Sequence, residues 1–145
     1  MLKIHQRLGL ITLAPFVATL ISSSGAKGSR NGASGVSISG GSTSSRDLHA
    51  GLGIATLGMY IATASYAIRA PRVPGTTTRG PILVHKTLAW IHGPGMILTP
   101  ILGALAYQQI NSGQKVHGIA AAHGAVAAVT GIAYGAALLS VSFKF

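Results

Sequence analysis

The chain lacks the side chains on which much enzyme chemistry depends. It has no cysteine, which excludes disulfides, iron–sulfur clusters and thiol nucleophiles. Its only acidic residue is Asp47, so no pair of carboxylates can carry out acid/base hydrolysis. No carboxylate lies in an apolar segment, where proton pumps and cation-coupled transporters place one. Hydrolases and ion-coupled transporters are therefore disfavoured, and an enzymatic role is left open.

Charge of either sign is scarce. Only 8% of the residues are charged and 48% are hydrophobic, whereas soluble domains carry about 25% charged residues. Crossing a membrane takes roughly 20 apolar residues. The sequence therefore predicts an all-α integral membrane protein, a single transmembrane domain with helices at about 4–23, 48–68, 82–107 and 116–143.

The first apolar segment has a second interpretation. Lys3 and Arg7 precede a short apolar run, and small residues follow at 24–26. This order is also typical of a cleaved signal peptide. We favour a retained helix, because the segment shares a pattern with the other three.

The connections predict how the helices are arranged. Residues 24–47 form a Gly/Ser-rich stretch that we expect to be a flexible loop, and the other two connections are short, which favours an up-down four-helix bundle. Basic residues are more numerous on the side of the two termini, so the positive-inside rule predicts cytoplasmic or stromal termini. The net charge of +10 is scattered over loops, which argues against nucleic-acid binding.

A short pattern recurs at the start of each predicted helix. An aliphatic residue precedes a histidine, and glycine or alanine follows four residues later. Steps of three and four residues then place small, weakly polar side chains on the same face. This fourfold internal repeat predicts that four histidines head the inner faces, namely His5, His49, His85 and His117.

An up-down bundle brings these histidines into two pairs. His5 and His85 would lie near one membrane face on diagonal helices, and His49 and His117 near the other. With neighbouring axes about 8–10 Å apart, diagonal helices leave a gap of roughly 12–14 Å. That gap suits a haem whose iron takes one imidazole from each side, and two such metal sites would carry electrons across the membrane.

Two further histidines lie deeper in their segments. We expect His92 to be an alternative haem ligand, a hydrogen-bond partner for a quinone or a haem propionate, or a satisfied core residue. His123 lies off the small face in this register. It therefore ranks below His117 as a cofactor-binding candidate.

The arrangement of histidines resembles the cytochrome b561 family, whose four-helix core holds two haems b between histidines on alternate helices. The stretch from VHKTLAW to INSGQKVHGIAAAHG is also similar to an uncharacterised four-helix membrane family of photosynthetic organisms, matching His85 and His117. The resemblance implies transmembrane electron transfer through bis-histidine haems. It leaves the electron donor open, because no ascorbate-binding loop is evident.

A different class of function fits the same composition. The chain has the features of a small non-catalytic subunit of a larger respiratory or photosynthetic membrane complex, with chlorophyll on single histidines or no cofactor. Histidines at helix ends can also be simple interfacial anchors. Membrane lipid and other membrane subunits are the expected partners in either case.

Overall fold

The computed structural model describes residues 1–27, 43–71 and 78–142, and within these ranges it contains helices and no strand. All four long helices are apolar and long enough to span a membrane, so the predicted all-helical chain is confirmed and is consistent with a multi-pass membrane protein. The predicted loop at 24–47 lies largely outside the described residues. The helices are α1 (Leu2–Lys27), α2 (Thr43–Ile68), α3 (Gly80–Asn111), the short 3₁₀ helix η1 (Gly118–Ala122) and α4 (His123–Ser142).

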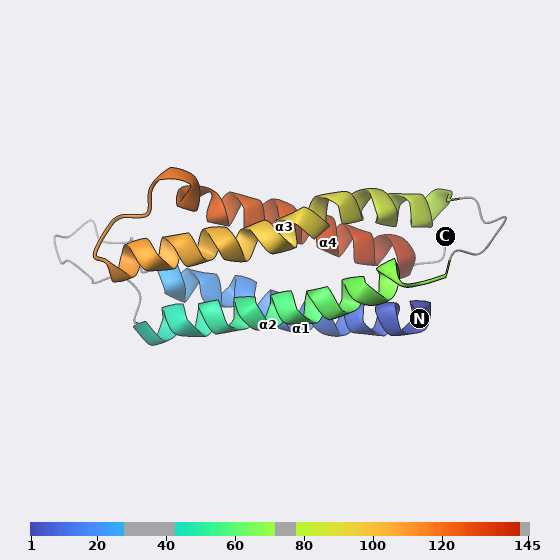
Figure 1. Cartoon of the computed structure of the whole chain (residues 1–145), viewed down its shortest axis with the longest axis horizontal. Helices are drawn as coiled ribbons and strands as arrows, with labels where there is room; N and C mark the ends of the chain where they lie inside the picture. The colour runs from blue at the N-terminus through green and yellow to red at the C-terminus, as the bar shows by residue number, and fades with distance from the viewer. Residues whose placement is uncertain (28–42, 72–77, 143–145) are drawn as a thin grey trace.

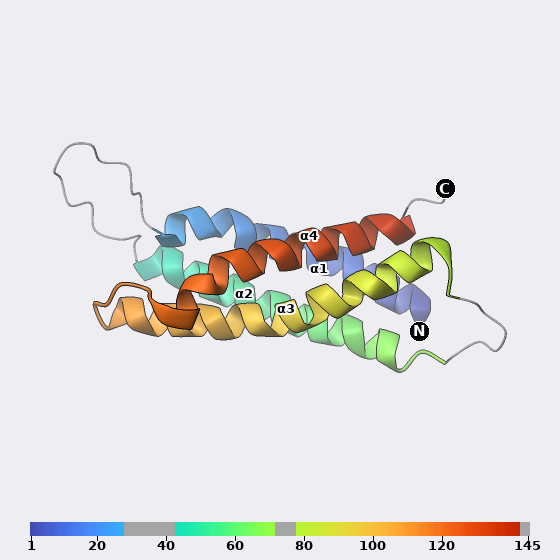
Figure 2. The same ribbon diagram turned by 90° about the horizontal axis from the view of Figure 1, so that it is seen from above.

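The four long helices form two tightly packed hairpins. α1 packs along α2 and α3 packs along α4, with far fewer contacts between the two hairpins. Figures 1 and 2 show that the start of α1, the end of α2, the start of α3 and the end of α4 lie at one end of the molecule. The hairpins therefore lie side by side, and any site between them draws residues from both.

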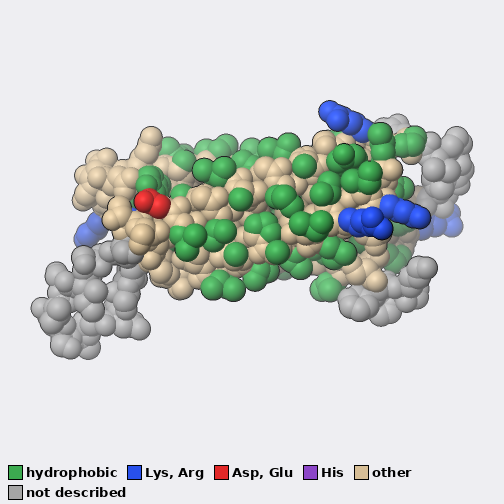
Figure 3. Space-filling view, turned by 90° about the horizontal axis from the view of Figure 1, so that it is seen from below, with side chains coloured by type: hydrophobic (Ala, Val, Ile, Leu, Met, Phe, Trp, Pro, Cys, Tyr) green, Lys and Arg blue, Asp and Glu red, His purple; other side chains and the backbone are tan. Residues whose placement is uncertain are grey.

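The outer surface is apolar and the charges lie at the ends. Many large hydrophobic side chains are exposed, and Trp90 and Ile68 are the clearest examples, each at 83%. Figure 3 shows most of the basic side chains of this view at one end of the molecule, and an acidic and a basic side chain at the other. Exposing so much apolar surface to water is unfavourable, whereas the hydrocarbon core of a bilayer accommodates it. Each helix also satisfies its own backbone hydrogen bonds, as a bilayer requires.

The interior, in contrast, is weakly polar. Phe16, Tyr60, Met96 and Tyr134 form the buried apolar cluster. Buried threonines surround it, and each donates its hydroxyl hydrogen bond to the carbonyl four residues earlier in its own helix. The threonines of this group are Thr12, Thr56, Thr63 and Thr130.

Helix α3 changes direction near its middle (Figure 2). Pro94 and Pro100 lie inside it, and a proline removes a backbone donor and bends a helix at the preceding turn. Gly95 adds a close approach, because a Cβ atom at this position would overlap the Thr130 side chain of α4. The bend and the glycine together let α3 follow α4 closely.

The start of the fourth helix differs from the prediction. We expected a helix from residue 116, but His117 is extended with φ −142° and ψ 175°, and Gly118 has φ +59°. Positive φ is readily adopted by glycine and ends helical geometry there. η1 follows, and α4 begins only at His123.

Candidate histidine sites between the hairpins

His5 and His85 lie next to one another across the two hairpins, with their rings nearly perpendicular. Their ring centroids are 5.9 Å apart and the ring planes are inclined by 83°. One ring comes from α1 and the other from α3, and both are half-buried. The structure therefore brings together two of the residues that the sequence predicted as a pair.

The second pair is formed by His49 and His123. Their ring centroids are 6.0 Å apart, with an interplanar angle of 88°, and the rings come from α2 and α4. The sequence had predicted His117 as the partner of His49. His117 is instead exposed, and its described hydrogen bonds join its backbone to the Gln109 side chain.

Each of the four rings forms a hydrogen bond with a backbone carbonyl of its own hairpin. The Nδ1–H group of His5 donates to Thr63 and that of His85 to Ala137, each at 2.9 Å. The Nδ1–H groups of His49 and His123 donate to Thr19 and Thr99 at 3.0 and 2.9 Å. Because a carbonyl can only accept, each bond places the proton on Nδ1 and makes Nε2 the nitrogen with a lone pair.

Such bonds have a known role around metal ions. A ligating histidine commonly donates its other ring N–H to a carbonyl or carboxylate, which fixes its tautomer and orientation. A hydroxyl group also lies beside one ring, since Ser22 Oγ is 3.1 Å from Nδ1 of His49. Each of the four rings therefore has the Nδ1 hydrogen bond that commonly orients a ligating histidine.

The four carbonyls occupy corresponding places in the sequence. Each acceptor lies 14 residues after the histidine of its own helix, two heptads further along the same face. Thus Thr19 follows His5 by this interval, and Ala137 follows His123. The same spacing relates Thr63 to His49 and Thr99 to His85.

The residues seven and eleven positions after each histidine show which histidine of the fourth segment matches the repeat. Counting from His123, α4 has threonine at the seventh position and tyrosine at the eleventh, Thr130 and Tyr134. α2 has Thr56 and Tyr60 at these positions after His49. Counting from His117 gives only glycine and alanine, so the aromatic residue would have fixed the register.

Each ring also has a small residue one turn away. The residue four places after the histidine is glycine or alanine in every helix, namely Gly9, Gly53, Ala89 and Ala127. The His123 ring has another close neighbour, because a Cβ atom at Gly103 would lie 3.0 Å from its Cε1 atom. A Cβ atom at Gly9 would lie 3.5 Å from Leu138 and 3.8 Å from Thr63, and one at Gly53 would lie 3.9 Å from Thr19. The small residues therefore let neighbouring helices approach closely beside the rings.

A buried layer separates the two pairs, with His92 at its centre. This ring is only 6% exposed, and its Nδ1 atom lies 3.0 Å from the Tyr60 hydroxyl. The ring centroid of Tyr134 lies 5.3 Å from that of His92. Tyr134 also joins the hairpins, because its hydroxyl donates to the Gly9 carbonyl at 2.7 Å.

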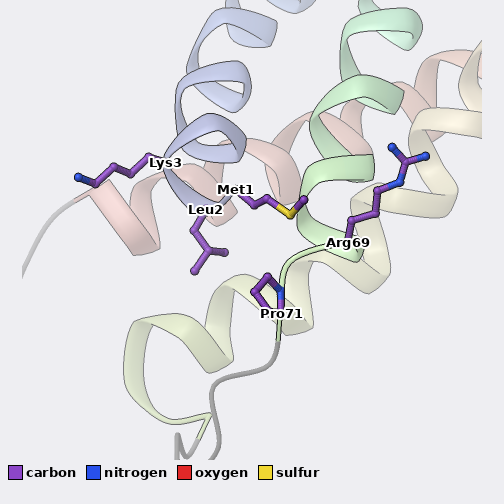
Figure 4. A pocket seen from close by; sticks show the side chains of 5 residues that line it. All are labelled: Met1, Leu2, Lys3, Arg69 and Pro71. Atoms are coloured by element: carbon purple, nitrogen blue, oxygen red, sulfur yellow. The ribbon is translucent and has the colours of Figure 1, made fainter.

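An open cleft of about 500 Å³ lies near the start of α1 and the end of α2 (Figure 4). Met1, Leu2, Lys3, Arg69 and Pro71 line it. Figure 4 shows the two basic side chains extending away from one another, so the cleft offers no convergent set of polar groups.

The described residues contain no group of three or more histidine, aspartate or glutamate side chains that could hold a metal ion. The histidine sites therefore offer two protein ligands each.

A search of family models, of curated proteins and of solved structures found no match to this chain.

Proposed function

We propose that the protein is a b-type cytochrome that binds two haems, one between His5 and His85 and one between His49 and His123. The observation that carries this proposal is the pair geometry. Two rings from different hairpins face one another twice, each with Nδ1–H bound to a carbonyl. His123 thus takes the ligand position that the sequence analysis assigned to His117.

The distance between the rings supports a shared ion. An imidazole nitrogen ligates a metal at about 2.0–2.1 Å, so two rings on opposite sides of one ion have centroids roughly 6 Å apart. The observed separations are 5.9 and 6.0 Å. Perpendicular ring planes fit equally well, because rotation about the metal–nitrogen bond leaves the ligating atom in place.

The number of protein ligands also favours haem over a bare ion. A structural zinc ion takes four protein ligands and a catalytic one usually takes three, whereas haem iron is already held by its macrocycle and needs only axial ligands. The residues one turn after the four histidines are all small, namely Gly9, Gly53, Ala89 and Ala127. Because the chain has no cysteine, the haems would be bound non-covalently.

The placement of the pairs suits electron transfer across a membrane. Haem iron, when bound, accepts and gives up one electron. The two pairs are separated by 14 residues along each helix, about 21 Å at 1.5 Å per residue. The chain holds the rings in fixed tautomers and surrounds the space between the sites with buried side chains, which excludes water.

The basic residues indicate an orientation. Those at the His5/His85 end are more numerous than those at the other end, where Asp47 also lies. By the positive-inside rule, the His5/His85 pair and both termini face the cytoplasm or stroma. Among the described residues, the basic ones of this end are Lys3, Arg7, Arg69, Arg79 and Lys86.

The facing rings also bear on the alternative role as a pigment-binding subunit. A pigment held by one histidine at a time does not require a second imidazole 6.0 Å away, so the His49/His123 pair favours haem. A cytochrome can still be one subunit of a larger membrane complex, and a quinone is one class of electron donor consistent with that setting.

The test is the visible spectrum of the purified protein. We expect sharp reduced-minus-oxidised bands of low-spin b-type haem, and a pyridine-extractable haem content near two per chain. A colourless preparation after expression with sufficient haem, or one that holds only chlorophyll, would contradict the proposal.

A further inference from the structure

His92 lies midway between the two histidine pairs. It lies seven residues after His85 and seven residues before Thr99. The Thr99 carbonyl accepts the hydrogen bond from His123. Each interval is about 10 Å along the helix. His92 is therefore the one buried histidine of the described core that belongs to neither pair.

This position holds threonine in the other three helices. Thr12, Thr56 and Thr130 satisfy their hydroxyl groups on their own helices, at 2.7 to 2.8 Å. A histidine cannot do the same with both ring nitrogens. Its Nδ1 atom contacts the Tyr60 hydroxyl, and its buried Nε2 atom has no hydrogen-bond partner.

An unsatisfied buried nitrogen is costly. Leaving such a group without a partner costs about 1–3 kcal/mol, whereas threonine at this position would be satisfied. Histidine therefore carries a cost here that packing alone does not explain, and a group that is retained at such a cost is a candidate for function.

We propose that Nε2 of His92 is a redox-linked proton site, which takes up one proton when one electron enters the haem held by His5 and His85. The inference rests on the proposed function. The electron comes from an outside one-electron reductant and ends on the haem iron, and the proton comes from water at the membrane face. The Nδ1–H group then donates to the Tyr60 oxygen, and Nε2 provides the lone pair that accepts the proton.

The electrostatics of the core favour this coupling. An added electron is poorly screened in a medium of low dielectric constant, so a proton taken up nearby lowers its free energy. The chain has one acidic residue, the exposed Asp47, and none in this core. The titratable groups around His92 are Tyr60 on α2 and Tyr134 on α4, whose rings contact it, and His85 and His5, which interact with it electrostatically.

Redox titration of the haem-loaded protein in lipid nanodiscs at several pH values between 5 and 9 tests the proposal. Dithionite and ferricyanide serve as reductant and oxidant. Since the reduced state binds the proton more tightly, we expect the midpoint potential of one haem to fall as pH rises. His92→Thr, which installs the residue of the other helices, and His92→Gln should each bind two haems and lose this dependence. Thr56→Ala, in the same layer, should retain it.

Redox-difference infrared spectra give an independent measurement. The unmodified protein should show imidazolium bands on reduction, and both His92 variants should lack them. A pH dependence that persists in both variants, or infrared spectra without imidazolium bands, would overturn the proton site while leaving the haem assignment intact. An unmodified protein without haem would overturn both.

Discussion

The His123 ring lies beside the His49 ring, with their centroids 6.0 Å apart, although 74 residues separate them in the chain. Both rings donate through Nδ1 to carbonyls of the helix packed beside them, Thr99 and Thr19. The relationship depends on α4 beginning at His123, because this start places the ring at the level of His49. It also distinguishes two histidines only six residues apart, His117 and His123, and so leads to a direct test.

We expect His123→Ala to lower the haem content from about two to about one per chain, with the same spectral component lost in His49→Ala. Each change would remove one of the two imidazoles that would hold this haem, so the haem would bind more weakly. His117→Ala is the matched control and should keep both haems, because this residue is exposed. Pyridine extraction and low-temperature difference spectra give the measurement. Loss of a haem in His117→Ala with none in His123→Ala would return the assignment to His117.

The other pair should behave as an independent site. His5→Ala and His85→Ala should each remove the second haem and leave the His49/His123 component unchanged, because the two pairs are about 21 Å apart along the helices. The double variant should lose no more haem than either single variant. If His5→Ala and His85→Ala were to remove different spectral components, these two residues would not share an iron.

Much of the fold could be predicted from the sequence. The four apolar segments are long and nearly free of charge, and such segments favour helices, which satisfy their own backbone groups. His5, His49 and His85 each lie eleven residues before a core aromatic or methionine residue, namely Phe16, Tyr60 and Met96.

The start of the fourth helix could not be predicted in the same way. The run from Val116 is apolar and small throughout, so hydropathy does not mark where helical geometry begins. The decisive local feature is Gly118, whose positive φ is a property of the folded chain. The carbonyl partners of the four rings lie 14 residues after each histidine, but they are backbone groups that every residue type carries, so residue identity alone did not single them out.

A close contact between α3 and α4 leads to a stability prediction. A Cβ atom at Gly95 would overlap Thr130, so Gly95→Ala should destabilise the protein by about 1–3 kcal/mol, the usual cost of overpacking. Thermal unfolding in detergent, followed by circular dichroism, measures the change. Gly58→Ala is the control and should be neutral or slightly stabilising, since nothing lies within 4 Å of its added Cβ atom and alanine is a better helix former than glycine.

The same contact offers a rescue. Thr130→Gly removes the side chain that the new methyl group would overlap, so the double variant Gly95→Ala with Thr130→Gly should regain stability relative to the sum of the two single effects. Residues in contact commonly show interaction energies of about 0.5–3 kcal/mol in such cycles. Simple additivity would mean that Thr130 is not the side chain that limits residue 95.

The final prediction concerns the space behind the His123 ring. A Cβ atom at Gly103 would lie 3.0 Å from Cε1 and 3.2 Å from Nδ1 of this ring, which is tighter than ordinary packing allows. Gly103→Val should therefore displace the ring, weaken its hydrogen bond to the Thr99 carbonyl and lower occupancy of the His49/His123 haem. The His5/His85 haem should remain, because no change is made at its end of the bundle. Gly124→Ala, adjacent to His123 in the chain but open to its surroundings, should keep both haems. Equal loss of both components in Gly103→Val would indicate general unfolding, and full retention of both would show that this glycine does not position the ring.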